Sequence, residues 1–426
     1  MEHTLTIKKV IAGGKGLGTL SDGMVAMVPA TLPGETVVVR EGRSHRGYQE
    51  ARLVRILEAS PDRIEPPCPY YGRCGGCDLQ HAAYPAQLKL KQRILRESLI
   101  RVRMEPPPDY PTLASPLAFG YRSRLRLHLD QSGCLGFHQQ ASNTVVPVAN
   151  CLLAAESINR VLTALVEGGW PARLAAEIAA IELIHSPADA AVAAVLAPRP
   201  RQRLRHVFPL ADHLRPLAEV VLLAGGHSRS ALVPVTFHQD FAPSGLGYRL
   251  GWDHHCFFQV NSRQNAQLVA TVLDLLPLTV RNTALDLYCG MGNFSIPLAM
   301  AGLEVTGIEQ NRASIRWART NSRAAGLTSI HFVADEVERR LQTLVNAGAR
   351  FNTILLDPPR QGAGKAAALL PLLQPSRILS ISCDPATLAR DLVQIVAQGY
   401  TVTRLIPVDM FPQTHHIESI ALLERI

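Results

Sequence analysis

The stretch Asp286-Leu-Tyr-Cys-Gly-Met-Gly-Asn-Phe-Ser295 decides the fold of the C-terminal part of the chain. It begins inside an apolar run typical of a strand, residues 284–288, and it precedes a segment that suits a helix. Gly290 and Gly292 let the backbone approach a ligand closely, because glycine carries no Cβ. A strand, a glycine loop and a helix in this order predict a ligand site at the end of the strand.

Further apolar runs follow, with room for helices such as residues 314–325 between them. Alternating strands and helices are typical of a doubly wound α/β sheet. The sequence therefore predicts such a domain over residues 251–426. Its other expected strands are residues 304–309, 330–334, 352–357 and 377–383.

An acidic residue, Glu309, ends the second expected strand, 19 residues after Gly290. A carboxylate at that place accepts hydrogen bonds from ribose hydroxyls. Asp335, near the end of the third strand, is a candidate to face an adenine amino group. The absence of a third glycine disfavours a dinucleotide pyrophosphate, so S-adenosylmethionine, which has no phosphate, fits the pattern better. The alternative is a glycine turn that binds no ligand.

Two further stretches bring reactive groups to the carboxyl ends of strands, where such sheets bind ligands. In Leu356-Asp-Pro-Pro-Arg360 the prolines stiffen the backbone, and we expect Asp357 to lie beside the cofactor. Asp384 followed by Pro385 predicts a helix start, which puts Cys383 just before a helix N-terminus. That position lowers the pKa of a thiol, so Cys383 is a candidate nucleophile. A small core residue is the alternative.

One more carboxylate lies near the C-terminus. The stretch Asp409-Met-Phe-Pro-Gln-Thr-His-His-Ile-Glu-Ser419 supplies Glu418 on or beside a further expected strand. A solvated surface carboxylate is the alternative reading of Glu418. His415 and His416, in the same stretch, are equally compatible with surface positions.

Residues 1–58 read as a small all-β unit, because short apolar runs are separated by glycine turns such as residues 13–18. Five short strands in this length suit a small barrel of the kind that grips oligonucleotides. Residues 1–103 hold 16 Lys and Arg against 10 Asp and Glu, an excess of positive charge that favours contact with a polyanion. The alternative is a basic barrel that only packs against the rest of the chain.

Three cysteines lie close together in a loop rich in proline and glycine. Cys68, Cys74 and Cys77 form a Cys-x5-Cys-x2-Cys pattern, which predicts a metal ion or an iron–sulfur cluster. A fourth ligand is expected from Cys134 or Cys151, and zinc is the alternative to a cluster. This loop belongs to an expected central region, residues 59–250, whose helix at about 85–102 is a candidate to pack on the C-terminal domain.

The central region also contains expected strands over residues 119–150. There Arg122, Arg124 and Arg126 alternate with Leu125 and Leu127, which places the arginines on one face of a strand. A solvated face is the plain interpretation of that alternation.

Composition bounds the class of protein. The 426 residues are 47% hydrophobic and 18% charged, which excludes a largely disordered chain. No apolar run approaches the roughly 18 to 20 residues of a membrane helix, and the first residues lack the apolar stretch of a secretory signal. We expect a cytoplasmic protein with no membrane contact and no obligate protein partner. The net charge of +8 permits RNA as a partner.

Together these motifs resemble the RNA uracil-C5 methyltransferase family along nearly the whole chain. The resemblance implies a TRAM domain, an OB-like RNA-binding barrel, in residues 1–58 and a Rossmann-like class I methyltransferase domain at the C-terminal end. It implies a [4Fe–4S] cluster on Cys68, Cys74, Cys77 and Cys151, which selects Cys151 over Cys134. Cys383 matches the family's nucleophile and Glu418 its general base. The matching cofactor or substrate positions are Gln259, Tyr288, Gly290, Asn293, Glu309 and Asp357, with Asp335 a looser match.

The resemblance also implies the reaction. S-adenosylmethionine would methylate uracil C5 to give 5-methyluridine, and the barrel with the cluster favours 23S rRNA over a tRNA T-loop uridine. A non-catalytic RNA-binding assembly factor and a methyltransferase for exocyclic amines are the alternatives. One departure is Gln413-Thr-His-His-Ile-Glu418, where family members more often have His-Thr-Gly-His before the glutamate. Glycine tolerates backbone angles that histidine does not, so this departure affects the expected backbone shape just before Glu418.

Overall fold

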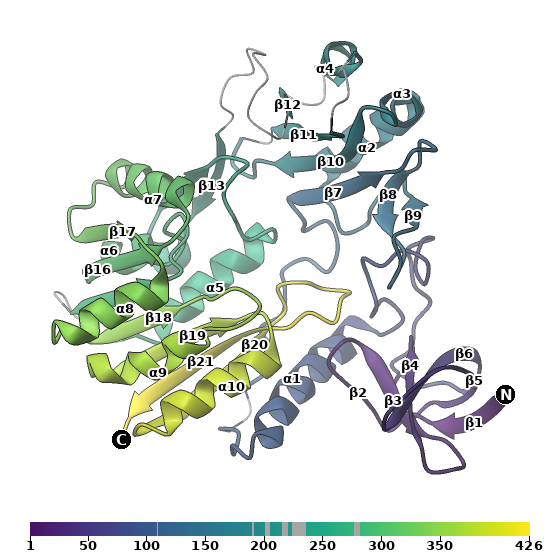
Figure 1. Ribbon diagram of the computed structural model, residues 1–426, viewed down its shortest axis with the longest axis horizontal. Coiled ribbons are helices and arrows are strands. Elements are labelled where there is room, and N and C mark those ends of the chain that lie inside the picture. Colours follow the sequence, from purple (N-terminus) through teal and green to yellow (C-terminus); the bar gives the residue numbers. More distant parts are fainter. Residues whose placement is uncertain (109, 190, 201–204, 215–219, 224–235, 277–281) are drawn as a thin grey trace.

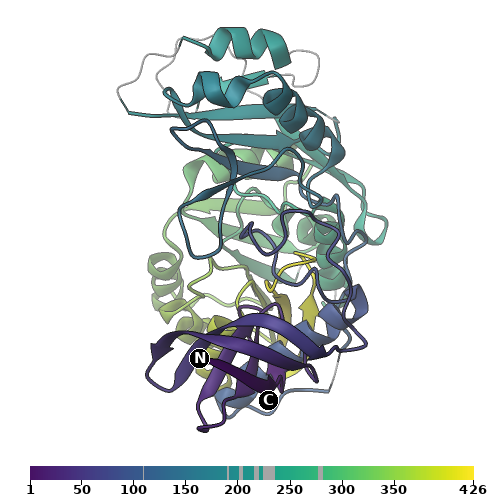
Figure 2. The ribbon, with the colours of Figure 1, turned by 90° about the vertical axis from the view of Figure 1, so that its right-hand side faces the viewer.

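The computed structural model describes residues 1–426 except 109, 190, 201–204, 215–219, 224–235 and 277–281. Its strands form separate sheets that follow one another along the chain (Figure 1). The N-terminal and central sheets lie toward opposite ends of the molecule (Figure 2). Within the described residues, no helix is both long enough and apolar enough to cross a membrane.

The N-terminal sheet has the strand order β1-β5-β6-β4-β3-β2, and buried valines such as Val28, Val37 and Val39 fill its core. The sequence predicted five strands and a turn at residues 13–18, but residues 1–58, all of them described, form six strands. A β-carbon on Gly16 would lie 2.2 Å from Thr31 Oγ1, so this strand needs glycine where the pattern suggested a turn. The strands are β1 (Glu2–Thr6), β2 (Lys9–Val10), β3 (Lys15–Thr19), β4 (Val25–Pro29), β5 (Thr36–His45) and β6 (Tyr48–Glu58).

The helix expected at 85–102 is present as α1 (Tyr84–Arg101). It packs on the C-terminal domain, where Leu95 and Leu99 join the buried core beneath α10. The same helix buries Lys91 completely, and Lys91 Nζ donates to Asp409 Oδ1 at 2.5 Å and to the Phe411 carbonyl at 3.0 Å. The helix therefore holds the segment that leads to Glu418.

The central sheet has the order β12-β11-β10-β7-β8-β9, with an apolar core between it and its helices. Leu125 and Leu127 of β7 are buried in that core, whereas Arg126 is exposed, as the alternation predicted. The elements are β7 (Arg124–Leu129), β8 (Leu135–His138), β9 (Val145–Pro147), α2 (Glu156–Glu167), α3 (Trp170–Leu174), β10 (Ile178–His185), β11 (Val192–Pro198), α4 (Val207–Leu214) and β12 (Val220–Leu223). A hairpin of β13 (Phe237–Phe241) and β14 (Tyr248–Trp252), linked by a 3-10 turn at Pro243–Gly245, follows.

The C-terminal sheet has the order β17-β16-β15-β18-β19-β21-β20. Pairing is parallel from β17 to β19, and β21 runs antiparallel to both of its neighbours. The expected α/β class is confirmed. The strands are β15 (Thr283–Leu287), β16 (Glu304–Glu309), β17 (Ile330–Ala334), β18 (Thr353–Leu356), β19 (Arg377–Ser382), β20 (Tyr400–Val408) and β21 (Glu418–Arg425).

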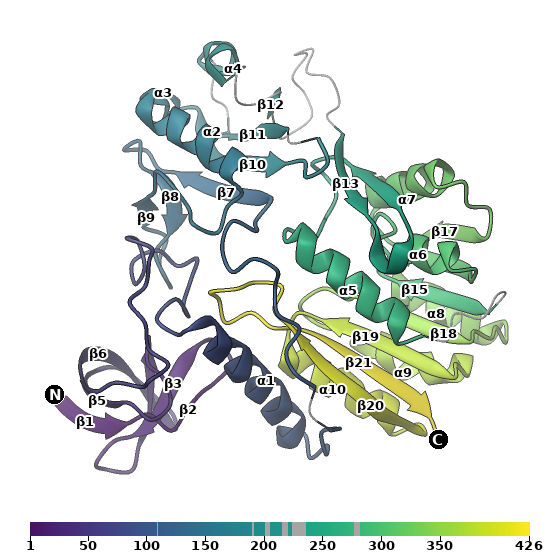
Figure 3. The same ribbon diagram turned by 180° about the vertical axis from the view of Figure 1, so that it is seen from behind.

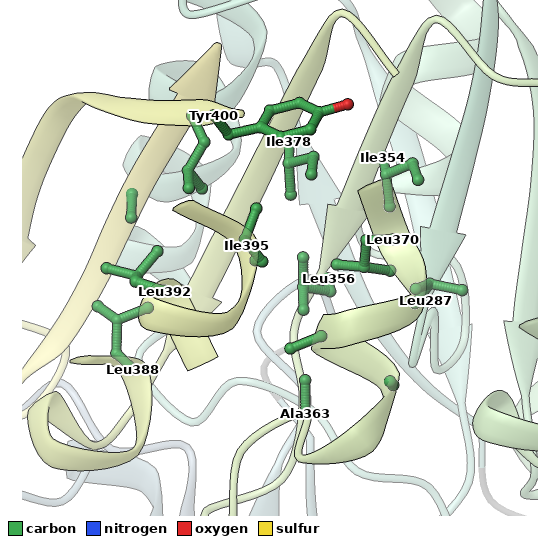
Figure 4. Packing of buried hydrophobic residues seen from close by; sticks show 14 of the residues in the cluster. Leu287, Ile354, Leu356, Ala363, Leu370, Ile378, Leu388, Leu392, Ile395 and Tyr400 are labelled. Carbon is green, nitrogen blue, oxygen red and sulfur yellow. The ribbon is translucent and has the colours of Figure 1, made fainter. Parts of the chain in front are cut away.

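Helices cover both faces of this sheet. On one face, Leu388, Leu392 and Ile395 of α10 pack on Ile378 and other strand residues (Figure 4). This packing holds the strands in place, and site residues lie at the ends of these strands. The helices are α5 (Ser262–Asp274), α6 (Ser295–Met300), α7 (Arg312–Ala324), α8 (Val337–Asn346), α9 (Lys365–Leu369) and α10 (Pro385–Val396), with a 3-10 turn at Leu370–Leu373.

Candidate active site

Cys383 occupies the junction between β19 and α10. Asp384 caps the helix, since its Oδ1 accepts from the backbone N–H groups of Ala386 at 3.0 Å and Thr387 at 2.8 Å, and Pro385 is the first helical residue. This confirms the helix start that the sequence predicted. The Cys383 side chain is half-buried, so a ligand can reach the sulfur.

Glu418 is the first residue of β21, the strand next to β19. Ser419 pairs with Ser382, and Ser419 Oγ donates to the Ser382 carbonyl at 3.1 Å. Glu418 therefore lies opposite Cys383 across the two strands. Its side chain is buried, and Oε1 has no hydrogen-bond partner. The solvated position that the sequence left open for Glu418 is thus excluded.

Asp357 directly follows β18, on the other side of β19. Burial raises the pKa of Asp357 to about 7. Burial and the neighbouring Asp357 carboxylate raise the pKa of Glu418 well above its usual value, while Arg360 acts in the opposite direction. Two carboxyl groups that share a site hold protons more tightly than either would alone.

The pKa of Cys383 is a correction to the sequence analysis. The helix N-terminus predicted a lowered pKa, but burial, with smaller contributions from Glu418 and Asp357, raises the pKa of this thiol to about 11. The helix terminus is outweighed because the thiolate would be poorly hydrated and would face two carboxylates. Arg360 is the cation that favours the thiolate. Sequence analysis assigned no role to Arg360, although it ends the quoted Asp-Pro-Pro-Arg stretch.

The glycine loop after β15 has the backbone that a close ligand requires. Tyr288 has a φ of 61°, Gly290 of 55° and Gly292 of 95°, all in the left-handed region. A β-carbon built on Gly290 would meet no atom within 4 Å, so the loop borders open space. Glu309 Oε2 accepts from Gly290 N–H at 3.3 Å, and Oε1 accepts from Asn311 N–H at 2.7 Å. The Glu309 carboxylate is therefore tied to the backbone of the loop, a contact that the sequence did not predict.

The other candidate cofactor residues differ in how they are held. Gln259 is buried in the segment between β14 and α5. Asn293 exchanges two side-chain hydrogen bonds with Asn265, at 2.8 and 3.1 Å. Asp335 follows β17 and its N–H donates to the Glu309 carbonyl, but its carboxylate is engaged by Arg339 and by the Glu336 N–H. Among these residues Asp335 is the least available to a ligand.

Asp286 is a site residue that the sequence analysis quoted but did not assign. It is fully buried beneath the glycine loop, and its Oδ2 accepts from Ser295 Oγ at 2.5 Å while Oδ1 has no partner. Burial raises the pKa of Asp286 to about 7. Its position before the two glycines was the signal that could have identified it.

The cysteines form a second candidate site. Cys68, Cys74, Cys77 and Cys151 all line one cavity of about 80 Å³, together with Arg122 and mostly apolar side chains. Cys134 lies in a turn and does not line this cavity, so the structure groups the first three cysteines with Cys151. Burial raises the pKa of Cys77 to about 12, and the other three cysteines add to that effect.

Two observations bear on what the cavity can hold. None of the eight cysteines forms a disulfide. In the part of the chain that the structure describes, no three ligand-type side chains converge closely enough to hold a single metal ion.

Comparisons with known proteins agree with this geometry. The family model described as tRNA (Uracil-5-)-methyltransferase matches residues 83–426. A Pseudomonas putida protein named 23S rRNA (uracil(1939)-C(5))-methyltransferase RlmD is 33% identical over 99% of this chain and 94% of its own length. A Pseudomonas aeruginosa protein of the same name is 35% identical over the same shares.

A solved structure has the same fold. The Pyrococcus abyssi tRNA (uracil-54, C5)-methyltransferase in complex with S-adenosyl-L-homocysteine superposes with a TM-score of 0.74, covering 98% of this chain and 99% of that one at 23% identity. The family model covers most of the chain, and the relatives match nearly all of it. The chain therefore belongs to the RNA uracil-C5 methyltransferase family.

Proposed function

We propose that this protein transfers a methyl group from S-adenosylmethionine to C5 of a uracil in 23S rRNA, which gives 5-methyluridine. The observation that carries the proposal is the pairing of Cys383 with the buried, unpartnered Glu418 on adjacent strands. The names of the relatives favour 23S rRNA as the substrate. Such a substrate implies a cytoplasmic enzyme.

Cys383 performs the covalent step. C5 of uracil is a weak nucleophile, so the Cys383 thiolate first adds to C6 and leaves an enolate on the base. Arg360 favours the thiolate, whereas burial opposes its formation, so the thiol first loses its proton to the surrounding water. Bound S-adenosylmethionine supplies the electrophilic methyl group that C5 takes.

Glu418 performs the proton transfer. After methylation C5 carries both a hydrogen and the new methyl group, and Glu418 removes that hydrogen as a proton. The electron pair of the C–H bond reforms the C5–C6 double bond, and the Cys383 thiolate leaves. A carboxylate with a raised pKa is a stronger base for this step, and Asp357 beside it orients the uracil or the cofactor.

The residues around the glycine loop fit S-adenosylmethionine. Open space at Gly290 admits a ligand against the backbone, and Glu309, at the end of the next strand, would bind the ribose hydroxyls. The orphaned Oδ1 of Asp286 lies beneath the same loop. The proposed cofactor-binding set is Gln259, Tyr288, Gly290, Asn293, Glu309, Asp335 and Asp357.

We further propose a [4Fe–4S] cluster on Cys68, Cys74, Cys77 and Cys151. The shared cavity and its mainly apolar lining support this donor set. No step of the reaction uses the cluster. Iron and sulfide analysis of anaerobically purified protein tests it, and stoichiometric zinc without iron would reject it.

The proposed function assigns a separate role to each of three regions of the chain. Residues 1–58 would be the TRAM-like RNA-binding barrel, residues 59–250 the cluster-bearing central domain, and residues 251–426 the methyltransferase domain. RNA is the proposed partner, and no obligate protein partner is needed. Residues 1–58 hold eight Lys and Arg against six Asp and Glu, a small positive excess that supports contact with phosphates.

A methyl-transfer assay with labelled S-adenosylmethionine tests the function. Unmodified 23S rRNA and tRNA are compared, and the labelled nucleoside is identified by mass spectrometry. We expect 5-methyluridine in 23S rRNA only, and none with Cys383→Ala. Product in tRNA alone would move the substrate to a T-loop uridine. Full activity of Cys383→Ala would contradict the covalent mechanism. No product in either RNA, from cluster-loaded protein, would favour a different target RNA first and an assembly factor second.

A further inference from the structure

The central sheet has one covered face and one partly open face. Leu125, Leu127 and Leu129 of β7 pack under the helices, and α2 contacts β10 and β11 on that side (Figures 1 and 3). The side chains of Arg124, Arg126 and His128 point to the opposite face, because successive residues of a strand alternate.

On the opposite face Arg126 is exposed and His128 is half-buried, whereas the guanidinium of Arg124 lies over the Phe258 ring. Along β10 and β11 this face is covered, since Ile184 and Val195 pack against Trp252 of the β13–β14 hairpin. Beside His128 the neighbouring strands present only small residues, Ala180 on β10 and Gly136 on β8. The imidazole of His128 is therefore not overhung by larger neighbours across the sheet.

Two histidine rings, His128 and His138, stack on each other on this face and are called the histidine platform below. The rings of His128 and His138 stack with centroids 3.8 Å apart and planes 19° apart. Both side chains are half-buried. Burial, His138 and Arg126 lower the pKa of His128, so this ring stays neutral at pH 7 and the stacked rings do not repel each other.

The arginines next to the platform differ in what they contact. Arg124 is held by Glu182, with hydrogen bonds of 2.7 and 2.9 Å. Arg126 is exposed and, in the portion of the chain that is described, forms no hydrogen bond or ion pair. Arg126 is therefore a free cation close to the histidine platform.

The row of basic residues leads to the active site. Arg122, just before β7, pairs with Asn261 in an isolated bridge, and its guanidinium lies 5.9 Å from the centre of the Phe411 ring. Phe411 belongs to the segment that leads into Glu418. The row from Arg122 to His128 spans about 20 Å, at roughly 3.3 Å per strand residue.

We propose that the exposed part of this face, around Arg126 and His128, binds single-stranded RNA next to the target uridine. Arg126 contacts a phosphate, and a base stacks on the His128–His138 pair. A cation beside aromatic rings is the combination with which proteins bind unpaired nucleotides. The inference rests on the proposed function, because it names where that enzyme holds its RNA.

Binding titrations and initial rates with one unmodified 23S rRNA fragment test the proposal. Arg126→Gln should raise KM and leave kcat unchanged, and it should reduce the slope of log affinity against log salt by about 0.7, the contribution of one phosphate. Arg160→Gln is the matched control, because Arg160 is an exposed arginine on α2, over the covered face of the same sheet. That control should bind as the unchanged protein does.

The platform is tested by a second pair of variants. His128→Ala with His138→Ala should weaken RNA binding about five- to 150-fold, the loss of one stacked base, whereas His128→Phe with His138→Phe should keep it. Melting temperatures check that each variant folds. If the Arg126 and alanine variants bind as Arg160→Gln does, the inference is wrong. If the unchanged protein makes no 5-methyluridine, the proposed function fails, and the binding titration still decides this inference.

Discussion

At the scale of single residues, Glu418 separates two steps of the proposed reaction. Glu418→Gln keeps the size of the side chain but cannot accept the C5 proton. Addition of Cys383 and transfer of the methyl group remain possible, so a covalent protein–RNA adduct should accumulate while turnover falls about 10²- to 10⁴-fold. A slow-migrating band on a denaturing gel measures the adduct. Its presence with Cys383→Ala, or its absence with Glu418→Gln, would contradict these roles.

The thiol of Cys383 makes a prediction about pH. Burial raises the pKa of Cys383 to about 11, so the ligand-free protein holds it as a thiol at neutral pH. Because the thiolate is the reactive form, the alkylation rate of the Cys383 peptide, followed by mass spectrometry, should rise with pH through 9 without levelling off. Asp357→Asn removes one neighbouring negative charge and should shift this profile to lower pH. A plateau near pH 7 would mean that the helix N-terminus dominates after all.

Residues near each other in sequence were the predictable part of the site. The cap at Asp384 and the glycine loop between β15 and α6 depend on local patterns, and both are present. The raised pKa of Cys383 was not predictable, because it arises from burial and from carboxylates on two other strands. Sheet order alone brings those strands together, and no local pattern in this chain states that order.

At the scale of elements, the parallel strands were predictable and the N-terminal strands less so. The strands expected at 304–309 and 330–334 match β16 and β17 residue for residue, although neither is a continuous buried run. Residues 15–19 were mistaken for part of a turn. Their glycines serve close packing against Thr31 and Leu5 rather than chain reversal, and only the folded neighbours reveal that.

One buried ion pair joins α1 to the start of the loop before Glu418, beside hydrogen bonds between Gln87 and Gln413. Lys91→Met removes the partner of the buried Asp409 and should lower the free energy of unfolding by about 3–5 kcal/mol. Adding Asp409→Leu removes the stranded charge and should restore much of the stability. Urea denaturation measures both variants. A double variant as unstable as Lys91→Met alone would show that the unpaired charge of Asp409 is not the cause of the lost stability.

At the scale of the whole molecule, three regions meet at the loop before Glu418, the segment between β20 and β21 that Figure 3 shows extending beyond the sheet toward the N-terminal half. The carbonyl of Gln413 accepts from the N–H groups of Asp78 and Leu79, at 3.2 and 3.1 Å. His415 binds the Asp78 carboxylate. Gly14 of the N-terminal sheet is so close that an added Cβ would lie 3.2 Å from both Asp78 and His415.

This arrangement makes the cysteine loop a support for the segment that leads to Glu418, the proposed general base. Asp78 directly follows Cys77, so anchoring Cys77 in a cluster should steady the segment that positions Glu418. Hydrogen exchange of the Asp78, Leu79 and Gln413 amides should therefore be slower in cluster-loaded protein than in metal-free protein, while amides of β15 and β16 remain unchanged. The comparison needs no RNA and no turnover. Equal exchange at these amides in both forms would show that the cluster does not support the loop before Glu418. A role of the cluster in the proposed RNA contact at the neighbouring central sheet would then be the next to test.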